Sequence, residues 1–378
     1  MYADHLLVPW FDSLSAAVPG LSVVDAHTHI GGNDPGGFTS QVDELVEALA
    51  LVDGRAAVFP MSEPGGYRQA NLSCTEAAAE HPDRLVAFAR VTPEENPRGL
   101  LEEALDAGAR GMKLHLSSDE FSLDDPRLAG ALDLADEQHL PVMVHAGPEV
   151  ESLRASVLAA CSGRPGMQMI LAHCAIPDLA HLAPHVDDVP NLFFDTSWWT
   201  PANLLALLRL VPPGRVLAAS DLPYSTPLAA TVATVRCAWQ AGLGPEEVLS
   251  VAGGQMSRLL DREQPLDLGP APSQRDDPKT AEASPFSSVL EVVTTNLLAS
   301  VEAMQRGLEP EVPLQVARHA CSVPTGQPDE AVLTSVLRLL DLYDEHRDAL
   351  PRRNPFTPGR DVLLTAAVVA RTPAAPLP

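Results

Sequence analysis

Lysine is nearly missing from this sequence of 378 residues. Of its 25 basic side chains only Lys113 and Lys279 are lysine, and the other 23 are arginine. Because arginine does not lose its proton at ordinary pH, a lysine kept in an apolar segment is a candidate for chemistry that a guanidinium cannot perform. Lys113 stands in such a segment, GMKLH.

Positive charge as a whole is also scarce: 50 acidic against 25 basic side chains give a formal net charge of −25. A surface this negative repels phosphate backbones and anionic lipid, so we expect no nucleic-acid partner and no membrane partner. No apolar run approaches the roughly 18 residues of a spanning helix. The first twenty residues contain acidic side chains and no positively charged start, unlike a secretory signal. We expect a soluble cytoplasmic protein.

Cysteine is sparse and scattered, with five residues and no C-x-x-C pair. An odd number without close spacing indicates neither a disulfide framework nor a thiolate zinc site. We expect reduced and partly buried thiols.

Short apolar, β-branched runs alternate with longer segments of helical periodicity between residues 21 and 260. The helical segments include Val42–Leu51, Pro126–Gln138 and Leu228–Gln240. Eight strand candidates recur at about the length of one βα unit, which favours the α/β class and a closed (β/α)₈ TIM barrel over an open sheet. The candidates are Leu21–Ala26, Arg55–Pro60, Leu85–Arg90, Gly111–His115, Pro141–His145, Met167–Ala172, Asn191–Asp195 and Arg215–Ser220.

The composition and periodicity of the sequence change after Arg262. Residues 263–285 contain five prolines and little apolar periodicity, which indicates a Pro-rich linker. We therefore expect a barrel domain over residues 1–262, the linker, and a mainly helical C-terminal extension over residues 286–378. In that extension the pattern predicts helices over 286–306 and 329–346, while 361–371 reads as a third helix or a strand.

Residues able to bind a metal stand at the ends of five of the eight apolar runs. In such a barrel, function gathers where the strands end. His27 and His29 are two residues apart, so on a strand both imidazoles leave the same face and can chelate one ion. The five runs give His27 and His29 (VVDAHTH), Lys113 and His115 (GMKLH), His145 (VMVH), His173 (ILAH) and Asp221 (LAASD).

This ordered set resembles the amidohydrolase superfamily, and within it the amidohydrolase 2 branch, over roughly residues 21–260. The family's H-x-H matches His27 and His29, its later histidines match His145 and His173, and its eighth-strand aspartate matches Asp221. GMKLH is similar to the fourth-strand segment of this branch. AGGQMSRLL is similar to its closing helix, except that glutamine replaces the usual asparagine.

The resemblance implies a divalent metal cofactor, with Zn²⁺ the first expectation because the ligands are nitrogen and oxygen without thiolate. With one metal, His27, His29, His145 and Asp221 are the ligands. Water on the metal then attacks a carbonyl carbon, Asp221 takes the proton of that water, and His173 polarises the carbonyl or acts as its acid–base partner.

The role of Lys113 differs between a two-metal and a one-metal mechanism. In two-metal relatives the fourth-strand lysine is carboxylated and bridges the ions, with His27, His29 and Asp221 on one ion and His145 and His173 on the other. Carboxylation needs an unprotonated amine, which burial favours. Alternatively, an ammonium here binds a substrate carboxylate, or the lysine is structural. The sequence supplies ligands for one metal or two, and we prefer one.

Several further residues are candidates for substrate binding. They are Lys113, His115, Arg68 and Trp198. His115 shares a strand face with Lys113, and Trp198 follows the seventh strand, where it forms a substrate wall or packs in the core. Arg90 and Asp195 are weaker candidates for the pocket, and Asp25 is either a carboxylate that orients the H-x-H or a turn residue.

The sequence therefore predicts a metal-dependent hydrolase of a small amide, lactone or ester. A nonoxidative decarboxylase or hydratase of a small carboxylic acid uses the same scaffold and is the alternative. A third possibility, of another class, is a catalytically silent barrel whose tail, from residue 286, mediates interaction or oligomerisation. We expect a small-molecule substrate, and the apolar faces of the tail allow a homo-oligomer.

Overall fold

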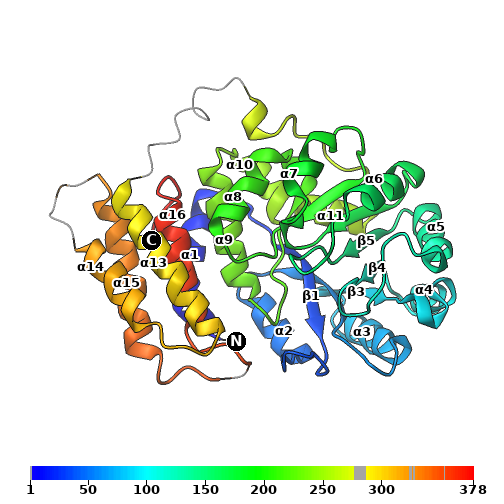
Figure 1. Cartoon of the computed structure of the whole chain (residues 1–378), viewed down its shortest axis with the longest axis horizontal. Helices are drawn as coiled ribbons and strands as arrows, with labels where there is room; N and C mark the ends of the chain where they lie inside the picture. Colours follow the sequence, from blue (N-terminus) through cyan, green and yellow to red (C-terminus); the bar gives the residue numbers. More distant parts are fainter. Residues whose placement is uncertain (1, 276–286, 323–325, 327, 353) are drawn as a thin grey trace.

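The computed structural model describes residues 2–275, 287–322, 326, 328–352 and 354–378. A barrel of alternating strands and helices occupies one side of the molecule, and a group of long helices lies beside it (Figure 1). The eight strands are neighbours in sequence order, and every neighbouring pair is parallel. The (β/α)₈ barrel predicted from the sequence is confirmed.

All eight strands form where the apolar runs predict them. Their bounds are β1 Val24–Ile30, β2 Arg55–Pro60, β3 Leu85–Arg90, β4 Gly111–Leu114, β5 Pro141–Val144, β6 Gln168–Leu171, β7 Leu192–Asp195 and β8 Val216–Leu217. Nearly every strand residue is buried, as expected for parallel strands covered on both faces.

Strand β1 differs from its prediction, because it begins later and continues through the H-x-H. Its pairing with β2 shifts register between Asp25 and Thr28 and then runs on to Ile30, opposite Pro60. The two histidines of the motif are thus strand residues, held in place by ladder hydrogen bonds. The prediction ended the strand at Ala26, but His27 and His29 remain in the strand and bring their rings together at the barrel mouth.

The barrel closes through the segment that follows β8. Ala26 N donates to Ala218 O at 2.9 Å, His29 N donates to Leu222 O at 2.8 Å, and Asp221 N donates to His27 O at 2.8 Å. These bonds connect the last strand to the first, and they bring Asp221 beside the H-x-H.

Helices surround the barrel, and α11 also closes the end opposite the strand ends that carry the histidines. The barrel interior is filled by apolar side chains that include Phe59, Phe88 and Phe193, and α11 adds Met256 and Leu259 beneath them. The helices over the first 262 residues are α1 Asp4–Ala17, α2 Val42–Ala50, α3 Arg68–Glu80, α4 Pro97–Asp106, α5 Ala129–Glu137, α6 Arg154–Gly163, α7 Leu179–Leu182, α8 Pro201–Leu210, α9 Pro227–Gln240, α10 Pro245–Leu249 and α11 Gln255–Leu260.

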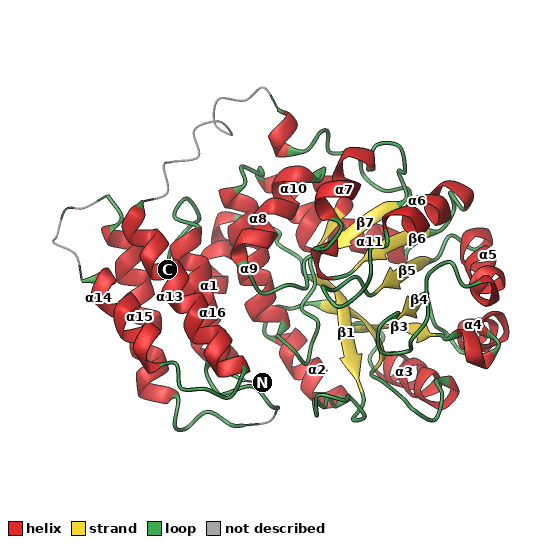
Figure 2. Ribbon diagram, in the orientation of Figure 1, coloured by secondary structure: helices red, strands yellow, loops and turns green. Residues whose placement is uncertain are grey.

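Four helices of the described residues form the C-terminal extension, which packs beside α1, α8 and α9 (Figure 2). They are α13 Ser288–Gln305, α14 Glu311–Cys321, α15 Glu330–His346 and α16 Arg360–Arg371. Residues 361–371, for which the sequence allowed a helix or a strand, form helix α16. Its valines lie in a helix whose residues are buried on nearly all sides. Helix α14 was not predicted; its Pro313 lies in the first turn, where a helix tolerates proline.

The Pro-rich linker is described only up to residue 275, and residues 276–286 lie outside the described part. Within residues 263–275 the chain is irregular apart from a short 3₁₀ turn at Pro272–Gln274. No helix among the described residues is long and apolar enough to cross a bilayer.

Candidate metal centre and cavity

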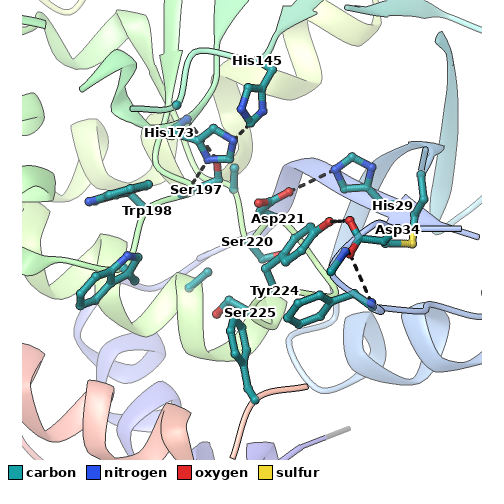
Figure 3. Close-up of a pocket in the computed structure, with 18 of the residues that line it drawn as sticks. His29, Asp34, His145, His173, Ser197, Trp198, Ser220, Asp221, Tyr224 and Ser225 are labelled. Atoms are coloured by element: carbon teal, nitrogen blue, oxygen red, sulfur yellow. Dashed lines mark hydrogen bonds and ion pairs between the residues drawn. The ribbon is translucent and has the colours of Figure 1, made fainter. Parts of the chain in front are cut away.

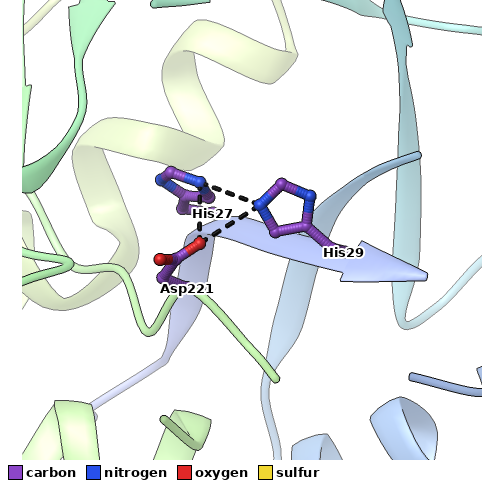
Figure 4. Close-up of side chains that lie close together, drawn as sticks. All are labelled: His27, His29 and Asp221. Atoms are coloured by element: carbon purple, nitrogen blue, oxygen red, sulfur yellow. Dashed lines mark hydrogen bonds and ion pairs between the residues drawn. The ribbon is translucent and has the colours of Figure 1, made fainter. Parts of the chain in front are cut away.

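Two side chains of β1 and one from the segment that follows β8 meet at one point. His27 Nε2 lies 3.2 Å from His29 Nε2, and Asp221 Oδ1 lies 3.0 Å from the first and 3.1 Å from the second (Figure 4). His27 is fully buried and His29 nearly so. These three residues form a cluster able to hold a metal ion.

Hydrogen bonds on the far side of each ring direct the Nε2 atoms inward. His27 Nδ1 lies 2.8 Å from Asp195 Oδ2, and His29 Nδ1 lies 3.4 Å from Pro60 O. A ring nitrogen that donates to an oxygen leaves the other nitrogen with its lone pair. Two such lone pairs and a carboxylate oxygen then face one another. A proton or a divalent cation at this point satisfies all three, so the donor set fits the metal that the sequence predicts.

Burial and neighbouring charges shift the pKa values of these three residues in opposite directions. Burial lowers the pKa of His29 to about 3, which keeps its ring neutral and able to bind a cation. Burial also lowers the pKa of His27, but the carboxylates of Asp221 and Asp195 outweigh it and raise that pKa overall. Burial raises the pKa of Asp221, yet the adjoining histidines hold it well below its ordinary value.

His145 and His173 form a second group at the ends of β5 and β6. His173 Nε2 lies 3.1 Å from His145 Nδ1, while His173 Nδ1 lies 2.8 Å from the backbone oxygen of Ser197 (Figure 3). His145 Nε2 contacts the carboxylate of Glu149. Burial lowers the pKa of both histidines, that of His145 to about 3. Both rings therefore present neutral nitrogens to each other.

The two groups are close but separate. The ring centroids of His27 and His173 are 5.3 Å apart, and His145 does not belong to the three-residue cluster. The structure thus brings all five predicted histidine and aspartate ligands to one end of the barrel, and it divides them three and two.

Lys113 lies beneath the first group. Its Nζ is 3.2 Å from His27 Nε2 and 4.7 Å from the centre of the Phe59 ring, and the side chain is fully buried. Burial lowers the pKa of this amine to about 7. Lys113 does not line the cavity, so the structure does not place it where an ammonium would clamp a substrate carboxylate.

Asp195 contacts one residue of each group. One carboxylate oxygen faces His27, and the other accepts the backbone N–H of His173 at 2.9 Å and of Ser197 at 2.9 Å. The sequence made Asp195 only a weak pocket candidate. The structure instead makes it a buried acceptor that orients a histidine from each group. Asp25 has a different place, because it accepts the backbone N–H of His27 and of Ser220.

A cavity of about 500 Å³ opens over both groups. His29, His145, His173 and Asp221 line it, and Trp198 forms part of its wall (Figure 3). This volume lies in the range of pockets that bind small organic ligands.

The predicted substrate-binding residues separate into two sets. His115 lines the cavity and stacks on His145 with ring centroids 3.9 Å apart, and Arg90 lines it while paired with Asp119 at 2.9 Å. Arg68 does not reach the cavity. Its side chain is 67% exposed on α3 and pairs with Glu103 at 3.0 Å. The prediction for Arg68 is wrong, because its helix turns it toward solvent.

The sequence was compared with known protein families. The sequence profile of a family described as amidohydrolase matches residues 24–254, more than half of the chain. The chain belongs to the amidohydrolase 2 branch of the amidohydrolase superfamily. The match covers every strand of the barrel and both histidine groups, and it ends before the helical extension. Among proteins with curated functions, none matches the sequence.

Solved structures share the barrel of this amidohydrolase at low identity. A TIM-barrel protein from Bordetella bronchiseptica is 15% identical with a TM-score of 0.52, covering 64% of this chain and 99% of its own. A probable 2-pyrone-4,6-dicarboxylic acid hydrolase from Acinetobacter baumannii is 16% identical, with a TM-score of 0.50 and coverage of 63% and 99%. A 5-carboxyvanillate decarboxylase from Sphingomonas paucimobilis is 16% identical, with a TM-score of 0.49 and coverage of 64% and 99%. The first two likenesses, with TM-scores of 0.50 or more, support the barrel fold.

The amidohydrolase cavity also contains residues that the sequence analysis missed. Glu149 lies four residues after His145, and Tyr224 lies three after Asp221, so their positions behind strand ends were a usable signal. Gln305, Phe356 and Arg360 line the cavity too, although they belong to the extension. No sequence pattern connects these three to the barrel.

Proposed function

We propose that this amidohydrolase is a metal-dependent hydrolase that acts at the carbonyl carbon of an amide, lactone or ester. The observation that carries the proposal is the meeting of His27 Nε2, His29 Nε2 and Asp221 Oδ1 at the edge of the cavity. These residues would hold a divalent cation, with Zn²⁺ the first candidate, which would polarise a carbonyl and supply a water nucleophile at neutral pH.

The protein's own groups have distinct tasks in this proposal. Asp221 is 16% exposed toward the cavity and has a second carboxylate oxygen with which to accept a proton from the attacking water and return it to the leaving group. His173 lines the cavity beside it; because its Nδ1 donates to the backbone oxygen of Ser197, its Nε2 lone pair is available to bind a cation that would polarise the substrate carbonyl. Asp195 and Ser197 hold the rings in position, so little reorganisation is needed when substrate binds.

The grouping of ligands bears on metal number. His145 pairs with His173 and not with the three-residue cluster, which favours the two-metal alternative over the single metal preferred from sequence. Lys113 suits the same alternative, because an amine whose pKa burial lowers to about 7 has the unprotonated form that carboxylation needs. In this arrangement His27, His29 and Asp221 hold one cation, and His145 and His173 hold the other.

Metal analysis tests this proposal directly. We expect elemental analysis of unstripped protein to find two metal ions per chain, and native mass spectrometry to show the mass of one added carboxyl group that Lys113→Met removes. Chelation should abolish turnover of an ester, lactone and amide panel, and Zn²⁺ should restore it. His29→Asn should lose metal while the exposed His319→Asn retains it. Protein that neither contains nor binds metal would refute the proposal.

A nonoxidative decarboxylase remains the second candidate, favoured by one observation. Arg90 is buried in the cavity wall, where Nη2 donates to Asp119 Oδ1 at 2.9 Å and contacts Ser118, so the wall holds a guanidinium of the kind that a substrate carboxylate would need. Release of CO₂ from a panel of aromatic and unsaturated acids, with no hydrolysis of the ester and amide panel, would select this reaction.

A further inference from the structure

The helical extension builds one end of the cavity. Gln305 ends α13, Phe356 precedes α16, and Arg360 and Leu364 lie on α16, yet all four line the same cavity as His29 and Asp221. The family match ends at residue 254, so this end of the cavity is outside the part that the family shares. The helices that build it lie beside the barrel (Figure 1).

Between the histidines and the extension the cavity wall is aromatic. Phe38 contacts Tyr224 and Phe356, with ring centroids 4.7 Å apart in each pair. Tyr224 in turn lies edge-on to His29 at 6.3 Å, so a continuous row of rings leads from the first histidine group to the extension. Trp198 stands on the other side, near His173 (Figure 3). Such walls bind an apolar body and exclude water.

The far end of the row is polar. Arg360 is 5% exposed, and its guanidinium lies 4.2 Å from the centre of the Phe356 ring. Nη1 donates to Tyr224 O at 2.8 Å and to Asp361 at 3.3 Å. With its amide oxygen toward the guanidinium, Gln305 accepts from Nε at 3.3 Å and from Nη2 at 3.2 Å. A guanidinium has five N–H groups, so these contacts leave one hydrogen on Nη2 for which the described residues provide no acceptor.

This polar end is held rigidly. Gly359, at φ +81°, sets the turn into α16, and a Cβ there would lie 2.7 Å from the Tyr343 ring. Helix α16 then packs along α13 and α15, which fixes Arg360 against Gln305. A donor whose position is set before binding loses little entropy when it meets a ligand.

We propose that this extension end is a second half of the substrate site, which binds the part of the substrate remote from the reacting carbonyl. The ligand it fits is an elongated carbonyl compound, with an apolar or aromatic body along the row of rings and a hydrogen-bond acceptor at its far end, for Arg360. This inference rests on the proposed metal centre for the placement of the reacting end.

Calorimetric titration with hydroxamates of increasing length tests the proposal on the metal-loaded protein. Acetohydroxamate reports the metal centre alone. Alkyl hydroxamates from butyl to decyl should bind at least about tenfold more tightly, because the tail enters the aromatic row. A terminal amide or carboxylate on the best chain should add about fivefold to tenfold through Arg360. Comparison of amide with carboxylate tells whether the preferred acceptor is charged.

Two substitutions distinguish the contribution of Arg360 from that of the aromatic row. Gln305→Leu, which removes the acceptor that orients Arg360, should abolish the gain from the terminal group and keep the gain from the chain. Leu364→Trp, which narrows the cavity at the extension, should abolish both while acetohydroxamate binds as before. Gln315→Leu repeats the first change at an exposed position of α14 and should alter nothing.

The outcomes distinguish this inference from the metal proposal. If acetohydroxamate binds but chain length and terminal group bring no gain, or the gains survive both substitutions, the extension is not part of the site. If acetohydroxamate does not bind, the metal centre fails. The matching alkyl amides, which lack the metal-binding head group, then test the extension end alone: affinity that rises with length and falls in Leu364→Trp supports it, and its absence overturns it.

Discussion

At the residue scale, the chemistry of the centre depends on which nitrogen of each imidazole carries a proton. His27 and His173 are both set by acceptors beneath them, and Asp195 touches both residues. A neutral His27 donates to Asp195 from Nδ1 and keeps its Nε2 lone pair for a cation. A single buried carboxylate therefore contacts the His27 ring in one group and the His173 backbone in the other.

Replacement of that carboxylate gives the first prediction at this scale. Asp195→Asn should weaken metal binding by about tenfold to a hundredfold, because an amide can turn its NH₂ toward His27 and favour the wrong tautomer. Competition with a chromophoric chelator measures the change. Asp12→Asn, at an exposed position of α1, is the control. Equal affinity in both variants would remove the orienting role of Asp195.

A second residue-scale prediction concerns Asp4, whose buried carboxylate accepts from Thr226 Oγ1 at 2.6 Å. Burial raises the pKa of Asp4 to about 7, with Asp361 acting in the same direction. The folded pKa thus exceeds the ordinary value of 3.8, so the folded protein keeps a proton that the unfolded chain releases. The contribution of Asp4 to stability is therefore greatest below pH 3.8, falls as the pH rises from there to about 7, and changes no further above that.

Urea unfolding at pH 5 and pH 8 checks the contribution of Asp4. Asp4→Asn keeps an acceptor for Thr226 and cannot ionise, so the loss of stability between these pH values should be smaller in the variant than in the parent. Asp361, whose pKa burial also raises, accounts for part of the remaining slope. The same pH dependence in both proteins would show that Asp4 ionises equally in the folded and unfolded states.

At the scale of elements, the closing helix depends on a close approach between two backbones. The turn of Ser250–Gly254 passes under the start of β1, where a Cβ on Gly253 would lie 2.5 Å from Ser22 O and 2.7 Å from Val24 N. Gln255, which stands where the family usually has asparagine, follows directly. It donates to Gly214 O at 2.5 Å and accepts from Leu266 N at 3.0 Å, so it ties the loop before β8 to the segment after the barrel.

The prediction at this scale is a loss of stability in Gly253→Ala. We expect the free energy of unfolding to fall by about 1–3 kcal/mol, because the added methyl group displaces β1 or the turn. Thermal and urea unfolding measure it. Gly163→Ala in α6, where a Cβ meets nothing within 4 Å, should be neutral or slightly stabilising. Equal behaviour of the two variants would show that β1 tolerates displacement.

At the scale of the whole molecule, a buried arginine attaches the extension to the barrel. Arg236 on α9 is fully buried and donates to Thr372 Oγ1 at 3.0 Å, Thr372 O at 3.1 Å and Pro376 O at 2.5 Å. These acceptors follow α16, where backbone carbonyls lack helical partners and attract positive charge. The barrel thus holds the end of the helix that presents Arg360 to the cavity.

Removal of that guanidinium should affect both parts of the molecule. Arg236→Met should lower the free energy of unfolding by about 2 kcal/mol or more, because carbonyl groups are left buried without donors. Limited proteolysis should also cut the chain after α16 more quickly. Arg110→Met at an exposed position is the control, and an unchanged unfolding curve for Arg236→Met would contradict this attachment.

The sequence alone indicated the barrel and which residues would meet at its rim. Periodicity is a local property, so eight apolar runs with helical segments between them were enough to indicate eight βα units. Parallel strands of one barrel end at one rim, which is why residues as distant as His27 and Asp221 were expected to meet. The structure confirms that they do.

Only the tertiary structure decided how these side chains are grouped and what surrounds them. The three-and-two division of the ligands, the burial of Lys113 beneath His27 and the exposure of Arg68 depend on side-chain direction, which a spacing does not contain. The cavity wall from α13 and α16 depends on how helices far along the chain pack against the barrel mouth. Packing of that kind is set by contacts between distant segments, and such contacts leave no periodic trace in the sequence.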